Sequence, residues 1–104
     1  MSVSVEIVLF RLNAGVSPEQ FLAAAKPTFD LLPRFDGYIN RELSMSEDGW
    51  WVDVVHWRDM ESALAASERI MADADGQAFG SLIDVTTIVM HHAAPQMSSL
   101  TEPA

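Results

Sequence analysis

The chain of 104 residues contains no cysteine and only six lysine and arginine residues. Without cysteine there can be no disulfide bond, no thiolate metal site and no cysteine nucleophile. No apolar run approaches the roughly 18 residues that a membrane-spanning helix needs. The first residues lack a basic segment and a small-residue cleavage site, so we expect no signal peptide and a cytoplasmic protein.

The scarcity of basic residues gives the chain a formal net charge of −9 at pH 7. Nucleic acids and anionic membrane surfaces are bound by clustered lysine and arginine side chains, so we expect neither as a partner. The hydrophobic share of 49% is that of a folded protein. We expect a single domain over residues 1–104, with a core over about 3–92 and a polar tail over 93–104.

Hydrophobic periodicity and turn signals predict the element order βαββαβ. Ser17 and Asp59 are the expected N-caps of two helices, and Pro27 should kink or shorten the first of them. Residues 73–80 are expected to form a loop or an irregular turn. The strands are expected over 3–12, 38–46, 50–57 and 83–92, and the helices over about 17–33 and 59–71. This order predicts a ferredoxin-like α+β fold, a four-stranded antiparallel sheet with two helices on one face.

The length of the loop around Asp48-Gly49 determines which side chains of the second strand lie on the same face of the sheet as those of the third. With a two- or four-residue loop, Asn40 lies on the helix-facing side with Asp53 and Trp57. A three-residue loop reverses this assignment, and the sequence does not choose between them. In the first arrangement the opposite face is strongly apolar, with Ile39, Leu43, Met45, Trp50, Val52 and Val54. Such a face is too apolar for water, so we expect a homodimer in which two sheets pack together.

Three segments resemble those of the dimeric α+β barrel superfamily, in particular its antibiotic-biosynthesis-monooxygenase-like domains. They are residues 10–17 before the first helix, 35–38 entering the second strand, and 57–63 entering the second helix. The resemblance covers about residues 3–92. It implies a small pocket in each subunit, between sheet and helices. Quinone-forming members oxidise polycyclic aromatic substrates with dioxygen and without metal or flavin.

Haem-degrading members of the superfamily use an asparagine on the first strand, a tryptophan before the second helix and a histidine after it. Trp57 matches that tryptophan. The asparagine position falls near Val8, and residues 72–82 contain no histidine. The resemblance therefore disfavours haem degradation, and we predict neither a cofactor nor a metal site.

The candidate catalytic residues are Asp53, His92 and Asn40. A desolvated carboxylate or an imidazole could take a proton from a phenol, and an amide could orient a carbonyl group or dioxygen. Each has a structural alternative: Asn40 at the surface, Asp53 paired with Arg11 or Arg41, and histidine as a satisfied structural residue. His92 and its neighbour His91 point to opposite faces, and the sequence leaves open which points inward.

The candidate residues for substrate binding are Trp57, Trp51, Glu6, Phe21 and Phe79. Trp57 could stack on a flat substrate and donate one hydrogen bond, or simply fill the core. Glu6 is a carboxylate on an otherwise apolar strand, so it must find a partner or change its protonation.

These residues favour a cofactor-independent monooxygenase acting on an aromatic or polyketide-like substrate. The alternative is a non-catalytic dimer that binds a small apolar ligand or serves as a stress-associated structural protein. A cavity beside Trp57 with convergent polar groups would favour the enzyme, whereas a space filled by side chains would favour the structural protein.

Overall fold

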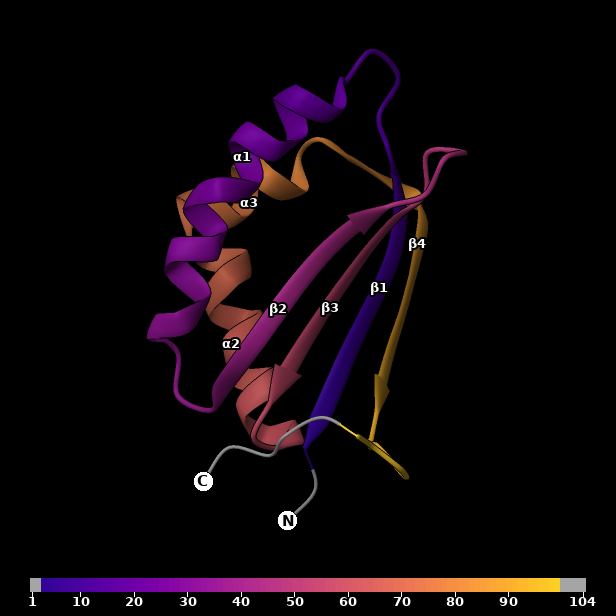
Figure 1. The fold of residues 1–104 in the computed structure, drawn as a ribbon. Coiled ribbons are helices and arrows are strands. Elements are labelled where there is room, and N and C mark those ends of the chain that lie inside the picture. The colour runs from indigo at the N-terminus through magenta and orange to yellow at the C-terminus, as the bar shows by residue number, and fades with distance from the viewer. Residues whose placement is uncertain (1–2, 100–104) are drawn as a thin grey trace.

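The computed structural model describes residues 3–99, which form one antiparallel sheet covered on one face by helices (Figure 1). The sheet order is β2-β3-β1-β4, so β1 and β3 are central. The strands are β1 (Ser4–Leu12), β2 (Tyr38–Met45), β3 (Trp51–Trp57) and β4 (Ile83–Ala93). The helices are α1 (Pro18–Leu31), a 3₁₀ turn η1 (Leu32–Arg34), α2 (Met60–Ala72) and α3 (Ala74–Gly80). The predicted ferredoxin-like order is confirmed.

Both predicted helix caps are confirmed. The Ser17 hydroxyl accepts a hydrogen bond from the Gln20 amide at 3.1 Å, and the Asp59 carboxylate accepts one from the Ser62 amide at 2.8 Å. These bonds satisfy amide groups that the first turn of a helix leaves without partners. Pro27 lies inside α1, which continues to Leu31.

The expectation of a loop over residues 73–80 is wrong, because α3 occupies that segment. Asp73 caps this helix by accepting a hydrogen bond from the Asp75 amide at 2.8 Å. Gly76 permits a close approach, since a β-carbon there would overlap the backbone carbonyl of Ile70. A seven-residue helix with two glycines carries too short a pattern for periodicity to reveal.

The facing predicted for β2 is also wrong, because the hairpin has the three-residue loop. Ser46 and Trp50 face each other across it, with the Ser46 amide 2.7 Å from the Trp50 carbonyl oxygen, and Gly49 adopts a φ of 88°. A three-residue hairpin with a left-handed glycine is a favoured turn. Asn40 therefore lies opposite His56, on the face away from the helices, and Leu43 lies opposite Asp53 on the helix side.

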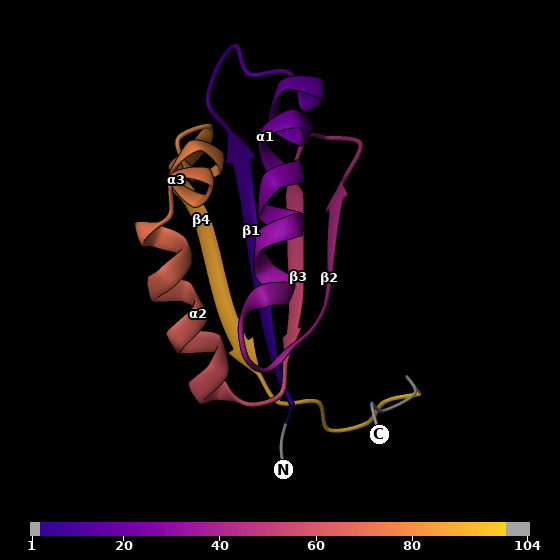
Figure 2. The ribbon, with the colours of Figure 1, turned by 90° about the vertical axis from the view of Figure 1, so that its left-hand side faces the viewer.

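A bulge at the start of β2 brings Tyr38 back to the helix side, opposite Trp57. Figure 2, turned by 90°, shows α1 lying along the sheet with α2 and α3 beside it. The outer face of the sheet carries no helix in the part of the chain described (Figure 1). Within residues 3–99, no helix is long and apolar enough to cross a membrane.

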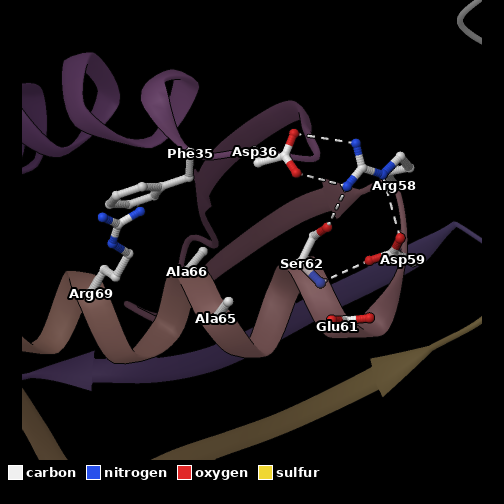
Figure 3. Close-up of a pocket in the computed structure, with 9 residues that line it drawn as sticks. All are labelled: Phe35, Asp36, Arg58, Asp59, Glu61, Ser62, Ala65, Ala66 and Arg69. Atoms are coloured by element: carbon white, nitrogen blue, oxygen red, sulfur yellow. Dashed lines mark hydrogen bonds and ion pairs between the residues drawn. The ribbon is translucent and has the colours of Figure 1, made fainter.

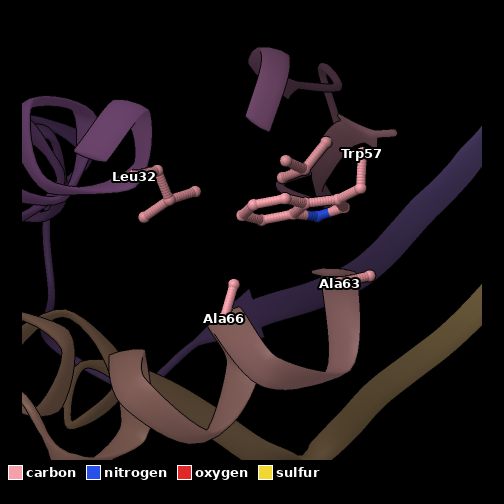
Figure 4. Close-up of a cluster of buried hydrophobic side chains, with 5 residues drawn as sticks. Leu32, Trp57, Ala63 and Ala66 are labelled. Atoms are coloured by element: carbon pink, nitrogen blue, oxygen red, sulfur yellow. The ribbon is translucent and has the colours of Figure 1, made fainter. Parts of the chain in front are cut away.

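The core consists of two clusters at opposite ends of the helix-covered face. One surrounds Trp57, with Leu32, Val55, Ala63 and Ala66 (Figure 4). The other is aromatic and contains Phe10, Phe21 and Trp51, with Phe79 packed against it. Trp51 and Trp57 lie six residues apart on one strand, which corresponds to about 20 Å.

Gly37 allows the start of β2 to pack closely against α2. It has a φ of 87°, and a β-carbon there would overlap the side chain of Ser62. We expect Gly37→Ala to lower the free energy of unfolding by more than the roughly 1–2 kcal/mol that a left-handed residue costs. Gly15→Ala is the matched control, because Gly15 has a φ of 86° and open space around its α-carbon. Urea denaturation measures both variants, and an equal loss of unfolding free energy in the two would contradict the close contact with Ser62.

Candidate active site

The helix-covered face of the sheet carries two buried carboxylates among apolar side chains. Asp53 lies on β3 and Glu6 on β1, the two central strands of the sheet. In the pairing of these strands, Asp53 lies opposite Val8, and Glu6 lies opposite Val55. An ionised carboxylate withdrawn from water needs a charged or hydrogen-bonding partner, so the partners of each define the chemistry available.

Asp53 is paired with Arg41. The guanidinium donates two hydrogen bonds to the carboxylate, at 2.9 Å from Nε and 2.8 Å from Nη2. Its Nη1 donates a third, at 2.8 Å, to the Thr28 hydroxyl on α1. The same group lies over the ring of Phe29, at 4.2 Å from the centroid, and that of Phe79, at 5.4 Å. Both charged side chains are shielded from solvent, with exposed fractions of 3% for Arg41 and 11% for Asp53.

Asp53 thus forms the ion pair that the sequence offered as its structural alternative. Both of its oxygen atoms accept hydrogen bonds from the bidentate guanidinium, so the side chain already has structural partners. The sequence argument underrated Arg41 because the assumed hairpin loop placed it on the outer face. With the three-residue loop, the same pattern places it beside Asp53.

Glu6 has weaker partners. Its Oε2 lies 3.3 Å from Nε2 of His92 on β4 and accepts a hydrogen bond of 3.4 Å from the Ser67 hydroxyl on α2. His92 is therefore the inward-pointing histidine, and the neighbouring His91 lies on the outer face opposite Ile7. A carboxylate bound to one ring nitrogen orients an imidazole and leaves its other nitrogen available for proton transfer.

Trp57 lies next to this pair. It stands opposite Ser4 on β1, so Glu6 is its diagonal neighbour on the same face. Diagonal neighbours in an antiparallel pair are about 7–8 Å apart, within reach of an aromatic side chain. The indole is 1% exposed, and its Nε1–H has no hydrogen-bond partner in the described part of the chain. A buried N–H group of this kind normally finds an acceptor, so this donor is unsatisfied within residues 3–99.

The other sequence candidates lie elsewhere. Asn40 is exposed on the outer face, which removes it from the helix-side site. Phe21 packs against Trp51 and Phe79, with ring centroids 4.8 and 4.7 Å away. Phe21 and Trp51 are 0% and 4% exposed, so this aromatic cluster forms a separate part of the core. The role of these three side chains in substrate binding stays a prediction.

A hollow of about 220 Å³ lies between α2 and the segment that enters β2 (Figure 3). At one end the Arg58 guanidinium is 2.9 Å from the Asp36 carboxylate and also contacts Asp59 and Ser62. At the other end Arg69 lies over the ring of Phe35, 5.8 Å from its centroid. The remaining lining residues are Glu61, Ala65 and Ala66.

Two of the carboxylates that line this hollow, those of Asp36 and Asp59, make structural contacts. The hydrogen bond and charge of Arg58 hold the pKa of Asp36 below its ordinary value. The hydrogen bonds from Ser62 lower the pKa of Asp59 in the same way. Both groups are therefore ionised at neutral pH and do not serve as proton acceptors. Among residues 3–99, no three histidine, aspartate or glutamate side chains are grouped to hold a metal ion.

Comparison with known proteins rests on structure, since no family model and no curated protein matches the chain. The structure is similar to SnoaB, a cofactor-independent oxygenase from Streptomyces nogalater, with a TM-score of 0.67, 16% identity and 100% of both chains covered. It is also similar to Rv0793 from Mycobacterium tuberculosis, with a TM-score of 0.72, 15% identity and coverage of 95% and 100%. A protein from Nitrosomonas europaea, provisionally described as an antibiotic biosynthesis monooxygenase, gives a TM-score of 0.72 at 14% identity, with 91% of each chain covered.

The chain has the antibiotic-biosynthesis-monooxygenase-like fold. The resemblance stated from the sequence is thereby confirmed at the level of the fold. Identities of 14–16% carry no reaction from one protein to another. One fold supports many activities, so the function of this chain must be argued from its own side chains.

Proposed function

We propose that this protein is a cofactor-independent monooxygenase that oxidises an electron-rich aromatic or polyketide-like substrate. One observation carries the proposal: the unpartnered indole N–H of Trp57 and the Glu6–His92 pair are neighbours on the buried face of the sheet. Together they supply a hydrogen-bond donor, a flat aromatic surface and a proton acceptor. SnoaB, a cofactor-independent oxygenase, has the same fold, so the fold is compatible with this chemistry.

The reaction class is the conversion of an anthrone-like methylene group to a carbonyl group. His92 takes a proton from the substrate, and the resulting carbanion is delocalised over the aromatic system. Dioxygen adds to that carbon; one oxygen atom becomes the new carbonyl oxygen, and the other leaves as water with the two hydrogen atoms of the methylene group. The substrate is the reductant and dioxygen the oxidant, so no further redox partner is needed.

The protein contributes position and proton transfer. Glu6 accepts the Nε2–H of His92 and so leaves Nδ1 to act as the base. The Trp57 indole donates its hydrogen bond to a substrate oxygen, where negative charge develops. The Arg41–Asp53 pair serves as a positioning element, because it joins α1 to the sheet beside this site.

Oxygen consumption tests the proposal. Wild-type protein, freed of metal with a chelator, should consume dioxygen with anthrone-like or quinol substrates and yield one quinone per dioxygen molecule. The reaction should continue with the chelator present and without added flavin. Uptake no faster than that of the substrate alone, across both substrate classes, would contradict the proposal.

A second candidate function is a structural or ligand-binding protein without catalysis. It is favoured by the packing of Trp57, whose 1% exposure matches a closed core. This candidate predicts no oxygen consumption and no effect of inhibitors that resemble the substrate. Oxygen uptake therefore separates the two functions.

We further propose that the protein is a homodimer whose two sheets meet at their outer faces. The correct register changes the residues involved. Leu43 and Met45 belong to the helix side, and β2 offers polar residues such as Asn40 and Glu42. The apolar stripe of the outer face is instead formed by the central strands and β4, with Val5, Ile7, Leu9, Val52, Val54 and Val89.

Light scattering at micromolar concentration should give twice the chain mass of 11.5 kDa. Val54→Asp places a charge in the apolar stripe and should yield a monomer, because an unpaired buried charge opposes association. Ser44→Asp is the control, since Ser44 lies on the same face but on the polar edge strand β2. A monomeric wild type would overturn the dimer.

A further inference from the structure

We propose that the hollow between Phe35 and α2 is the vestibule through which an aromatic substrate reaches Trp57. This inference rests on the proposed function, because it assigns an access route to the same site. The hollow has a volume of about 220 Å³ and opens at the surface of the protein. Trp57 itself is 1% exposed, so a substrate can reach it only if a side chain moves.

Two residues are shared by the lining of the hollow and the packing around the indole. Phe35 and Ala66 line the hollow on one side and belong to the packing around Trp57 on the other. Ala66 lies on α2 and contributes only a methyl group to this packing. Figure 4 shows Ala66 and Ala63 on the α2 side of the Trp57 ring.

Phe35 is the part of this lining that can move. Its backbone is fixed on both sides: its amide donates to the Leu32 carbonyl at 3.1 Å, and its carbonyl accepts from the Tyr38 amide at 3.3 Å. Its side chain is only partly buried and is covered from solvent by the Arg69 guanidinium. Rotation of this ring requires no change in backbone hydrogen bonds, and rotamer changes of such side chains are fast.

The chemistry of the lining indicates the class of molecule admitted. Phe35, Ala65 and Ala66 are apolar. Of the carboxylates at the rim, Asp36 is held by Arg58 and Asp59 by the first turn of α2. A planar aromatic molecule can replace the Phe35 ring beneath Arg69, because a guanidinium stacks equally well on either.

The test uses 1-naphthol as a non-oxidised aromatic probe under nitrogen, with the indole N–H signal of Trp57 observed by NMR. Trp57→Phe assigns that signal among the three tryptophans. Ala65→Leu narrows the vestibule without entering the core, since Ala65 is exposed. Leu64→Phe is the matched control, because Leu64 is 52% exposed on the same helix and does not line the hollow. Phe35→Ala removes the gate.

We expect naphthol to shift the Trp57 signal in the wild type. Ala65→Leu should slow both binding and release by about tenfold, the effect of about 1.4 kcal/mol in a barrier. Phe35→Ala should accelerate both, and Leu64→Phe should leave both unchanged. Equal rates in Ala65→Leu and Leu64→Phe, or a Trp57 signal that naphthol never shifts, would overturn the vestibule. If Ala65→Leu slows naphthol binding but the wild type consumes no oxygen, the oxygenase function is refuted and the vestibule is not. If the wild type consumes oxygen and Ala65→Leu consumes it at the same rate, the vestibule is refuted and the oxygenase function is not.

Discussion

Replacing Arg41 with methionine is expected to lower the free energy of unfolding by about 3–5 kcal/mol, the usual cost of leaving a buried charge without its partner. The substitution removes both hydrogen bonds to Asp53 and the one to the Thr28 hydroxyl. It also removes the cation that lies over Phe29. Methionine keeps much of the volume, so the loss reports the stranded carboxylate more than a cavity.

Chemical denaturation of three variants isolates this effect. In the double variant Arg41→Met/Asp53→Leu no charge is left unpaired, so most of the lost stability should return. Arg34→Met is the control, because Arg34 is exposed and carries no ion pair among the described residues. If Arg41→Met were as stable as Arg34→Met, the buried pair would not hold α1 to the sheet.

Replacing His92 with alanine is expected to lower kcat for oxygen consumption by about 10²–10⁴-fold, the usual contribution of a general base. KM should change little, because the imidazole acts on the proton rather than on the binding of the ring. Glu6→Gln should give a smaller loss, since it removes the group that orients His92 but leaves the imidazole in place. Added imidazole should restore part of the activity of His92→Ala alone.

The adjacent histidine provides the control. His91 lies on the outer face of the same strand, opposite Ile7, so His91→Ala should retain full activity per dimer. Equal losses from His91→Ala and His92→Ala would indicate damage to β4 instead of loss of a base. An unchanged kcat in His92→Ala would remove His92 from the mechanism.

The fold could be read from the sequence because its local signals agree with one another. Ser17 and Asp59 cap the helices as expected, and the strands begin and end close to the predicted residues. Whether the loop between β2 and β3 has an odd or an even number of residues could not be predicted from the sequence. Loops of two, three or four residues all suit Asp48-Gly49, and a change of one residue exchanges the two faces of β2. Because of this one uncertainty, the sequence argument placed Asn40 on the helix-covered face, where the structure has Arg41.

Side-chain partners were harder still to predict. Ser67 reaches Glu6 from α2, and Thr28 reaches Arg41 from α1. Such contacts depend on how each helix is placed over the sheet, which periodicity does not determine. His92 was found to face inward only because the register of β4 against β1 pairs it with Glu6.

The measurement that most directly tests the central claim is the fate of labelled oxygen. Metal-free protein would be mixed with an anthrone substrate under ¹⁸O₂, and the quinone would be analysed by mass spectrometry before its carbonyl groups exchange with water. The proposed mechanism predicts one ¹⁸O atom in the new carbonyl group, formed faster with the wild type than with His92→Ala. A quinone without ¹⁸O, or a yield equal to that of the protein-free reaction, would contradict the assignment of this chain as a monooxygenase.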